Sequence, residues 1–334
     1  VFSLMESAYT ISARIKSPQP INSPGVDVRN YTFIVNPEAG KGSAERTWWR
    51  LQPLIAGSGI QHDVVRTESE GDGTRLAAIA SGQCVVAVGG DGTVNEIANA
   101  LVGSEKTMGV IPAGSGNDMI KSIGVPVETE AAFQVLLRGE KLVMDVGTVR
   151  CSGSDEVLPE SGELKSRYFV NGVGVGFDAA VAVRTREIRF LSGTALYLLA
   201  ALQTLGKYDS PFYDVTFDGE SRRSRNLLMA IGNGICAGGG FYLTPDARVD
   251  DGLLDLCVIE RASVPRILRL MPSVMRGKHG PAKEVNFYRA KEINISCKTP
   301  FYVHADGEIV GRGVRNVQLG ILPGSLTVFG KLNQ

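Results

Sequence analysis

Short apolar runs and amphipathic stretches alternate along the first part of the chain, from Tyr31 to about Val149. Runs rich in β-branched residues predict buried strands at 31–35, 63–66, 84–88, 108–111 and 142–149. Apolar residues spaced by three and four positions predict helices at 43–56, 74–80, 93–101 and 129–137. Strands that alternate with helices predict a parallel sheet with helices on both faces, so the expected fold class is α/β.

The pattern changes near residue 150, where a polar, glycine-rich stretch at 151–165 predicts a hinge or a hairpin loop. Tyr213, Val215 and Phe217 alternate before Asp218-Gly219, a strong signal for a β-hairpin. Further strands are expected at 227–231, 253–259, 292–296, 301–304, 317–321 and 325–329, with helices at 194–205 and 265–275. This part of the chain is therefore expected to be mainly antiparallel.

The chain of 334 residues is long enough for about two domains. Residues 1–29 contain three prolines among polar residues and predict a loose extension. We expect an α/β domain over 30–148 and a second domain over 149–314, with residues 315–331 able to complete the first.

Composition narrows the classes of function. Lys and Arg balance Asp and Glu at 35 each, which argues against a nucleic-acid binder held by bulk charge. The five cysteines are odd in number and form no C-x-x-C pair, so a reducing, cytoplasmic setting is expected. The three histidines lack the spacing of a zinc site, and no apolar run approaches the ~20 residues that cross a bilayer.

Four glycine-rich or polar turns follow predicted strands, at 36–42, 67–73, 89–93 and 112–118. In an open parallel sheet, ligands bind outside the carboxyl ends of the strands. These turns are therefore expected to form one binding edge.

The turn Gly89-Gly90-Asp91-Gly92-Thr93 is the most informative of the four. Its glycines allow close approach of a ligand, and the following helix start favours an anion. An aspartate beside a phosphate indicates a bound metal, so the turn predicts a nucleotide phosphate with Mg²⁺. Thr93 and Glu96 match a capping box. The alternative is a tight strand-to-helix turn with Asp91 as a cap.

Two other turns carry candidate ligands of the same site. The segment 36–42 contains Gly40-Lys41 but lacks the first glycine of a P-loop, because that position is Val35. Lys41 could still meet a phosphate, or could simply face solvent. Asp118 could share Mg²⁺ with Asp91, although alone it would be expected to cap the next helix.

Later loops offer weaker signals. The glycines and aspartates at 238–252 suit a hard cation, but a hydrated loop is the simpler interpretation. Asp306-Gly307-Glu308 could position a general base, although Asp-Gly is also common in hairpins. We expect His304 to pack or make a local hydrogen bond, and 171–176 to form a close-packed strand and bend.

Taken together, the motifs resemble the diacylglycerol kinase catalytic family in its two-domain form. The resemblance rests on Asn-Pro-x-x-Gly-Lys at 36–41, the segment 89–96, Gly-Ser-Gly-Asn-Asp at 114–118, the segment 245–252 and Asp-Gly-Glu at 306–308. It implies a nucleotide-binding α/β domain, a C-terminal β-sandwich domain for the lipid and an active site between them.

The resemblance also implies roles for individual residues. Glu308 would be the general base, Asp306 would support it, and Asp91 would organise the catalytic Mg²⁺, with Asp118 a weaker candidate. A structural metal would bind Asp251 and the carbonyls of Arg248 and Leu253. The residues implied to bind ATP are Asn36, Pro37, Gly40, Lys41, Thr67, Gly90, Asp91, Gly92, Thr93, Asn95, Glu96 and Ser115.

We therefore expect an ATP- and Mg²⁺-dependent lipid kinase with diacylglycerol as the favoured acceptor. Alternatives are kinases of a sphingoid base, phosphatidylglycerol or NAD, and a nucleotide-binding regulator without activity. The expected location is cytoplasmic with peripheral membrane contact, no nucleic acid is expected as a partner, and a homodimer is possible. Arg184, Arg186 and Arg189, before the apolar stretch 195–205, could rest on an anionic membrane or could rim a buried helix.

Overall fold

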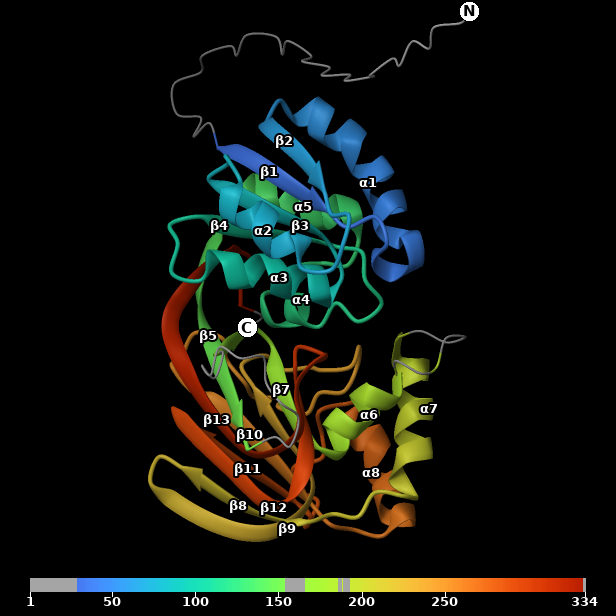
Figure 1. The fold of residues 1–334 in the computed structure, drawn as a ribbon. Helices are drawn as coiled ribbons and strands as arrows, with labels where there is room; N and C mark the ends of the chain where they lie inside the picture. The colour runs from blue at the N-terminus through green and yellow to red at the C-terminus, as the bar shows by residue number, and fades with distance from the viewer. Residues whose placement is uncertain (1–28, 154–165, 186–187, 189–192, 333–334) are drawn as a thin grey trace, which may run out of the picture.

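The computed structural model describes residues 29–153, 166–185, 188 and 193–332. Its N-terminal part alternates strands and helices as predicted (Figure 1). Its strands are β1 (Asn30–Val35), β2 (Gln61–Arg66), β3 (Cys84–Gly89) and β4 (Thr107–Pro112). Its helices are α1 (Ala39–Ser58), α2 (Asp72–Ile79), α3 (Asp91–Leu101), α4 (Met119–Ser122) and α5 (Thr129–Arg138).

These strands form a parallel sheet in the order β4-β3-β1-β2. Every residue of β3 and β4 is buried, which is why both segments are continuous apolar runs. The carboxyl ends of the strands therefore lie at one edge, where the turns after β1, β3 and β4 meet. This arrangement confirms the predicted α/β class.

The C-terminal part consists of antiparallel strands with helices on one side (Figure 1). The strands are β5 (Lys141–Ser152), β6 (Arg167–Phe169), β7 (Gly172–Gly176), β8 (Phe212–Phe217), β9 (Glu220–Gly232), β10 (Leu254–Glu260), β11 (Val285–Ala290), β12 (Glu292–Ala305) and β13 (Glu308–Phe329). The helices are α6 (Phe177–Thr185), α7 (Gly193–Leu205) and α8 (Val264–Val274).

Strand β12 joins the two layers of a β-sandwich, because its two halves pair with different strands. Its first half pairs with β8 through Ile293–Cys297, and its last residues pair with β7 through Val303–Ala305. Register shifts between Ser296 and His304 separate the two halves. Because β9 pairs with both β7 and β8, the four strands close a ring around an apolar core that includes Val175, Tyr213 and Phe301.

Strand β13 belongs to both parts of the molecule. It pairs antiparallel with β5 and β12, and its end runs parallel to β4 at Thr327 and Val328. Phe329, at the end of β13, is fully buried in the same apolar core as Phe33 of β1. The last strand of the chain thus completes the first sheet.

Several predicted elements differ from those observed. The strands expected at 292–296 and 301–304 are one strand, β12, and those at 317–321 and 325–329 belong to β13. Strands β6 and β11 and helix α6 were not predicted. The hairpin at Asp218-Gly219 is confirmed, because Phe217 pairs with Glu220 across it.

The three C-terminal helices pack side by side on the outer face of β9 and β10. They enclose a third apolar cluster that includes Phe177 from α6, Leu205 from α7 and Leu270 from α8. Among the described residues, no helix has both the length and the apolarity needed to cross a membrane. All five cysteines are free.

Candidate active site

The turn after β3 leads directly into helix α3. Gly90 is the residue before the helix, in an extended conformation, and Asp91 is the first helical residue. A Cβ on Gly90 would lie 3.0 Å from the Cα of Gly114, so the turns after β3 and β4 touch. The free N–H groups at the start of α3 point out of this edge and favour an anion.

The predicted capping box is wrong, because α3 begins three residues earlier than it requires. Thr93 already lies in the first turn, where its hydroxyl accepts a hydrogen bond from the Asn36 side chain at 3.0 Å. The Glu96 carboxylate accepts the N–H groups of Gly71 and Gly73, at 2.9 and 2.8 Å. Thr93 and Glu96 therefore tie the turn after β1 and the start of α2 to α3.

The turn after β1 has a special backbone. Gly40, Lys41 and Gly42 are consecutive residues with positive φ, so the regular part of α1 starts only after them, as predicted. A Cβ on Gly40 would lie 2.3 Å from the carbonyl oxygen of Ala113, so this turn packs against the turn after β4. Successive N–H groups in such a turn form a concave surface that suits phosphate.

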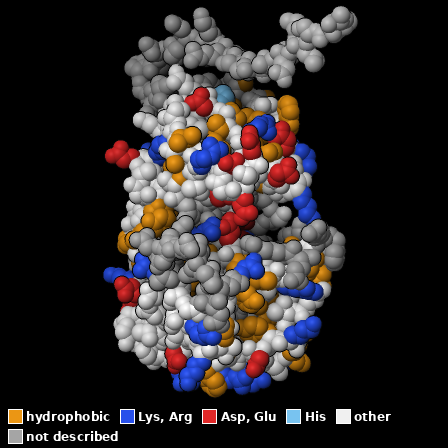
Figure 2. Space-filling view, in the orientation of Figure 1, with side chains coloured by type: hydrophobic (Ala, Val, Ile, Leu, Met, Phe, Trp, Pro, Cys, Tyr) orange, Lys and Arg blue, Asp and Glu red, His pale blue; other side chains and the backbone are white. Residues whose placement is uncertain are grey.

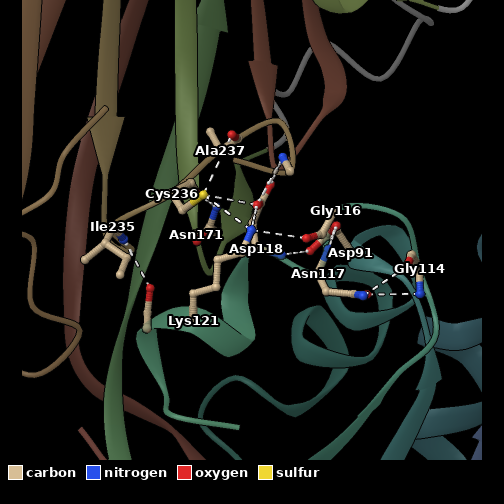
Figure 3. A network of polar contacts seen from close by, with 12 residues as sticks. Asp91, Gly114, Gly116, Asn117, Asp118, Lys121, Asn171, Ile235, Cys236 and Ala237 are labelled. Carbon is tan, nitrogen blue, oxygen red and sulfur yellow. Dashed lines mark hydrogen bonds and ion pairs between the residues drawn. The ribbon is translucent and has the colours of Figure 1, made fainter. Parts of the chain in front are cut away.

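Asp91 is the central carboxylate of this edge (Figure 3). It accepts hydrogen bonds from the backbone N–H groups of Asn117 and Asp118, at 2.8 and 2.6 Å. Burial and the nearby charge of Asp118 raise the pKa of Asp91 to about 6. Within the described ranges no cationic side chain pairs with Asp91, so its charge is left for a metal ion such as Mg²⁺.

Asp118 holds two loops together, and its share in a Mg²⁺ site stays a prediction. Its carboxylate forms an ion pair with Lys121 at 2.7 Å and accepts the N–H of Gly239 and the thiol of Cys236 (Figure 3). It makes no side-chain cap on α4, so the capping alternative is wrong. Asp118 thus fixes the 238–240 loop of the C-terminal part to the turn after β4.

Asp306 is a buried junction between the two parts of the molecule. Its carboxylate accepts hydrogen bonds from the N–H groups of Val170, Asn171 and Gly172 and from the Asn95 side chain, all at 2.7–3.0 Å. Burial raises its pKa, and these four donors oppose that rise. With its lone pairs engaged in this way, Asp306 positions the turn that carries Glu308.

The turn at 89–93, between β3 and α3, is called the phosphate turn from here on. Glu308 lies opposite this turn. A Cβ on Gly92 would be 4.0 Å from a Glu308 carboxylate oxygen, although 216 residues separate the two in sequence. Glu308 forms an ion pair with Arg167 of β6. Burial raises the pKa of Glu308 above its ordinary 4.5, while Arg167 opposes the rise. A half-buried carboxylate of this kind is suited to accept a proton.

A cavity of about 260 Å³ opens between Asp91, Asp306 and the loop at 238–240. On its wall the Asp178 carboxylate and His304 Nε2 are 2.9 Å apart, and both side chains are buried. His304 Nδ1 accepts the N–H of Gly307 at 3.3 Å, so the proton on Nε2 is donated to Asp178. His304 therefore makes the local contact that was expected and also a long-range one that was not.

A second cavity, of about 60 Å³, lies among α6, α7, α8 and the outer face of β9. Its walls are apolar except for Asp178, which also lines the first cavity. The two cavities are therefore neighbours that share the Asp178 side chain. Figure 2 shows acidic side chains gathered where the upper and lower parts of the molecule meet, at the level of this site.

The predicted structural metal site lies elsewhere, at the start of β10. The Asp251 carboxylate accepts the N–H of Leu253 at 3.1 Å and pairs with Arg289. Neighbouring Asp255 has a buried oxygen without a partner, and burial raises its pKa to about 6. Arg289 also pairs with Asp255, at 3.4 Å, so its guanidinium neutralises both carboxylates in this structure. A metal held by Asp251 and the carbonyls of Arg248 and Leu253 stays a prediction.

The remaining predicted nucleotide residues lie along the same edge. Thr67 is buried at the end of β2, where its N–H donates to the carbonyl of Val35 at 3.0 Å. Ser115 is exposed in the turn after β4, and Lys41 is exposed after β1. Within the described chain no three His, Cys, Asp or Glu side chains form a ready metal cluster.

The sequence analysis missed several residues of this site: Asn117, Lys121, Arg167, Asp178 and Cys236. Asn117 alone carried a local signal, since it follows Gly-Ser-Gly and adopts a positive φ that asparagine tolerates. The other four are isolated polar residues that only the tertiary fold brings to the cavity.

Comparison with known proteins agrees with this geometry. Residues 30–149 match the diacylglycerol kinase catalytic domain, and residues 171–330 match the YegS C-terminal NAD kinase β-sandwich-like domain. A diacylglycerol kinase of Staphylococcus saprophyticus is 27% identical over 286 residues, covering 84% of this chain and 89% of the relative. A diacylglycerol kinase of Mycobacterium tuberculosis is 29% identical over 287 residues, with the same two coverages.

Solved structures show the same fold. A Bacillus anthracis structure provisionally named as a diacylglycerol kinase superposes with a TM-score of 0.71 at 24% identity, covering 91% of this chain and 98% of its own. The two matched domains follow one another along the chain and meet at the site described above. The chain therefore belongs to the diacylglycerol kinase catalytic family of two-domain lipid kinases.

Proposed function

We propose that this protein uses ATP and Mg²⁺ to phosphorylate the hydroxyl group of a lipid, with diacylglycerol as the favoured acceptor and phosphatidic acid as the product. The observation that carries the proposal is the place of Glu308. This carboxylate faces Gly92 of the phosphate turn, and burial raises its pKa. A base beside a phosphate site is the arrangement that a kinase requires.

The reaction needs one proton transfer and one displacement. Glu308 takes the proton of the lipid hydroxyl while that oxygen bonds to the γ-phosphorus of ATP. The bond from the γ-phosphorus to the bridging oxygen breaks, and ADP leaves with the electron pair. Arg167 holds Glu308 in its charged form, and Asp306 fixes the turn that carries it.

The nucleotide is expected to lie against the turns after β1, β3 and β4. The N–H groups at the start of α3 and around Gly40 supply the cradle for phosphates. Asp91 is the proposed Mg²⁺ ligand, because its carboxylate is buried and forms no ion pair with a cationic side chain among the described residues. Mg²⁺ would neutralise the charge that develops on the phosphates.

The lipid is expected to enter from the C-terminal side. The larger cavity, lined by Asp91, Asp306 and Gly307 next to Glu308 in sequence, is the proposed place of the hydroxyl end, and the apolar cavity among α6, α7 and α8 suits part of an acyl chain. These apolar walls favour a lipid over NAD as the acceptor. A cytoplasmic location and peripheral contact with a membrane belong to this proposal. A homodimer remains a separate hypothesis.

The decisive experiment measures transfer of labelled phosphate from ATP into a mixed lipid extract, with products identified by mass. The wild type should produce phosphatidic acid. Glu308→Gln should lose activity by about 10²–10⁴-fold without weaker ATP binding, because it removes only the base. Glu105→Gln, on an exposed loop, is the matched control and should behave as the wild type.

Other outcomes would redirect the proposal. A phosphorylated sphingoid base or phosphatidylglycerol would keep the chemistry and change the acceptor. Phosphorylation of NAD alone would point to the soluble-acceptor alternative. ATP binding with no phosphorylated product would favour the regulator alternative and refute the kinase.

A further inference from the structure

The segment 261–283, which contains α8, is strongly basic. It includes six Lys or Arg residues and no Asp or Glu, in a chain whose net charge is zero. Arg266 pairs with Glu284 and so is neutralised. Within the part of the chain that the structure describes, the other five basic side chains of the segment form no ion pair.

Helix α8 has two apolar faces with different surroundings. Its inner face places Ile267, Leu270 and Val274 in the apolar cluster beneath the helix. Its outer face leaves Val264, Leu268 and Met275 exposed, at 41%, 40% and 38% of their surface. Residues spaced by four and seven positions share a helix face, so the exposed side chains form one stripe along α8.

Basic side chains flank this stripe. Arg269 lies on the exposed part of the helix, Arg276 and Lys278 are exposed in the turn that follows it, and Arg261 is exposed before it. An apolar stripe bordered by arginine and lysine, with no acidic neighbour on the helix, is the pattern of a helix that lies in a membrane interface. Such a helix buries its apolar side chains among the lipids and keeps its cations at the headgroups.

The location of α8 relates this surface to the site. The inner face of α8 lines the apolar cavity through Ile267, Leu270 and Val274. Helix α7 lies beside α8 (Figure 1) and exposes Leu202 at 45% of its surface. One helix thus separates an apolar cavity from an exposed apolar stripe, which is the geometry needed to receive a lipid from a bilayer.

We propose that the outer face of α8, defined by Val264, Leu268, Arg269, Met275 and Arg276, docks on an anionic lipid bilayer and presents the apolar cavity to it. The proposal rests on the proposed lipid kinase function and adds the surface that meets the membrane. It differs from the docking predicted for the segment 184–205. Arg186 and Arg189 of that prediction lie outside the described residues, and Arg184 bonds to Gln203 of α7.

The test measures binding to sedimentable vesicles of phosphatidylcholine with and without phosphatidylglycerol. The wild type should bind the anionic vesicles more tightly. Arg269→Gln with Arg276→Gln should weaken that binding by about 25-fold, since each basic side chain near an anionic surface contributes a factor of about five. Leu268→Asp should also weaken binding, including binding to neutral vesicles.

A matched control removes the same charge from the other part of the molecule. Arg50→Gln with Arg138→Gln changes two exposed cations on α1 and α5 of the N-terminal part and should leave vesicle binding unchanged. If both double variants lost vesicle binding equally, the effect would come from net charge alone, and the proposal would be overturned. Unchanged vesicle binding in the α8 variants would also overturn the proposal.

Activity is measured separately, on a short-chain acceptor dispersed in detergent. The α8 variants should retain wild-type turnover there, because none of the altered residues belongs to the site. Loss of vesicle binding with retained activity supports the docking surface. Kinase inactivity of the wild type in detergent would count against the proposed function and not against docking. A dimer that dissociates in the Leu268→Asp variant, with vesicle binding intact, would assign the stripe to a second copy of the chain.

Discussion

At the scale of single residues, the site depends on carboxylates whose surroundings give them different tasks. Asp306 accepts four hydrogen bonds from N–H donors and holds the backbone. Asp118 is neutralised by Lys121 and links two loops. Asp91 and Glu308 have raised pKa values and line the space where phosphate and hydroxyl would meet. In the proposed function, the same side-chain chemistry supplies scaffold, metal ligand and base.

The pairing of Glu308 with Arg167 predicts a change in the pH profile. Glu308 acts as a base only when ionised, so activity should fall as the pH drops through its raised pKa. Arg167 lowers that pKa, so Arg167→Met should move the acid limb of kcat/KM to higher pH. Arg167→Lys retains the charge and should move it less. An unmoved limb, or one shifted to lower pH, would remove Glu308 from the role of base.

The contact between His304 and Gly307 predicts a difference between two conservative substitutions. Asparagine can replace Nδ1 of histidine as an acceptor, whereas glutamine can replace Nε2 as a donor. If His304 positions the Glu308 turn, His304→Asn should retain kcat, and His304→Gln should lower it by about tenfold. Both variants should bind ATP normally.

The readout that separates positioning from simple stability is the ratio of the two kcat values at equal thermal stability. If kcat fell in both variants in step with the melting temperature, the hydrogen bond between His304 and Asp178 would have a purely structural role.

At the scale of elements, the sequence predicted the strand ends better than the strand lengths. The turns at 36–42, 89–93 and 112–118 follow continuous apolar runs, so their meeting at one edge follows from parallel pairing. Lys298-Thr299-Pro300 and Pro323-Gly324 resemble turns between separate strands. In the structure they are irregularities inside β12 and β13, where the pairing register shifts.

The functional contacts were less predictable than the elements. Arg167 meets Glu308 across 141 residues, and Asp178 meets His304 across 126. No local pattern encodes such pairs, because they depend on which strands become neighbours. Helix α6 was missed for a related reason: the glycine-rich β7 before it predicts a bend, and its packing against α7 is tertiary.

The turn after β1 permits a matched test of its packing. Gly40→Ala would place a Cβ 2.3 Å from the Ala113 carbonyl oxygen, whereas Gly42→Ala meets only a flexible Arg46 atom at 3.9 Å. Both glycines have positive φ, so each substitution costs about 1–2 kcal/mol of backbone strain.

Only Gly40→Ala should in addition displace the turn and raise the KM for ATP, by about tenfold or more. Steady-state kinetics with varied ATP, alongside thermal melting, would measure the difference. Equal KM values in the two variants would show that contact between the turns after β1 and β4 is irrelevant to nucleotide binding.

At the scale of the whole molecule, the two parts share one continuous sheet and a network of polar contacts at their junction. Asp118, Asn95 and Asp306 join residues that lie more than a hundred positions apart. The carboxyl end of β13 also joins the two parts, because it packs in the N-terminal core. We therefore expect the two parts to unfold together.

A substitution at the end of the chain tests that coupling. Phe329→Ala removes a fully buried ring and should lower the free energy of unfolding by about 3–5 kcal/mol. Fluorescence of Trp48, which packs in the same N-terminal core, should report the loss at the temperature where far-UV circular dichroism also changes. Phe212→Ala, half exposed on β8, is the control and should cost much less. Two separate transitions would contradict a single cooperative unit.

The path of β13 also has a consequence for the synthesis of this protein. The nucleotide-binding turns lie within the first 120 residues, yet the sheet that holds them lacks its neighbour to β4 until Thr327 and Val328 have been made. A ribosome emits the chain from its N-terminus, so the early strands must wait with an open edge while the entire C-terminal part is translated. The part of the molecule that is made first is consequently completed only after the C-terminal part has been translated.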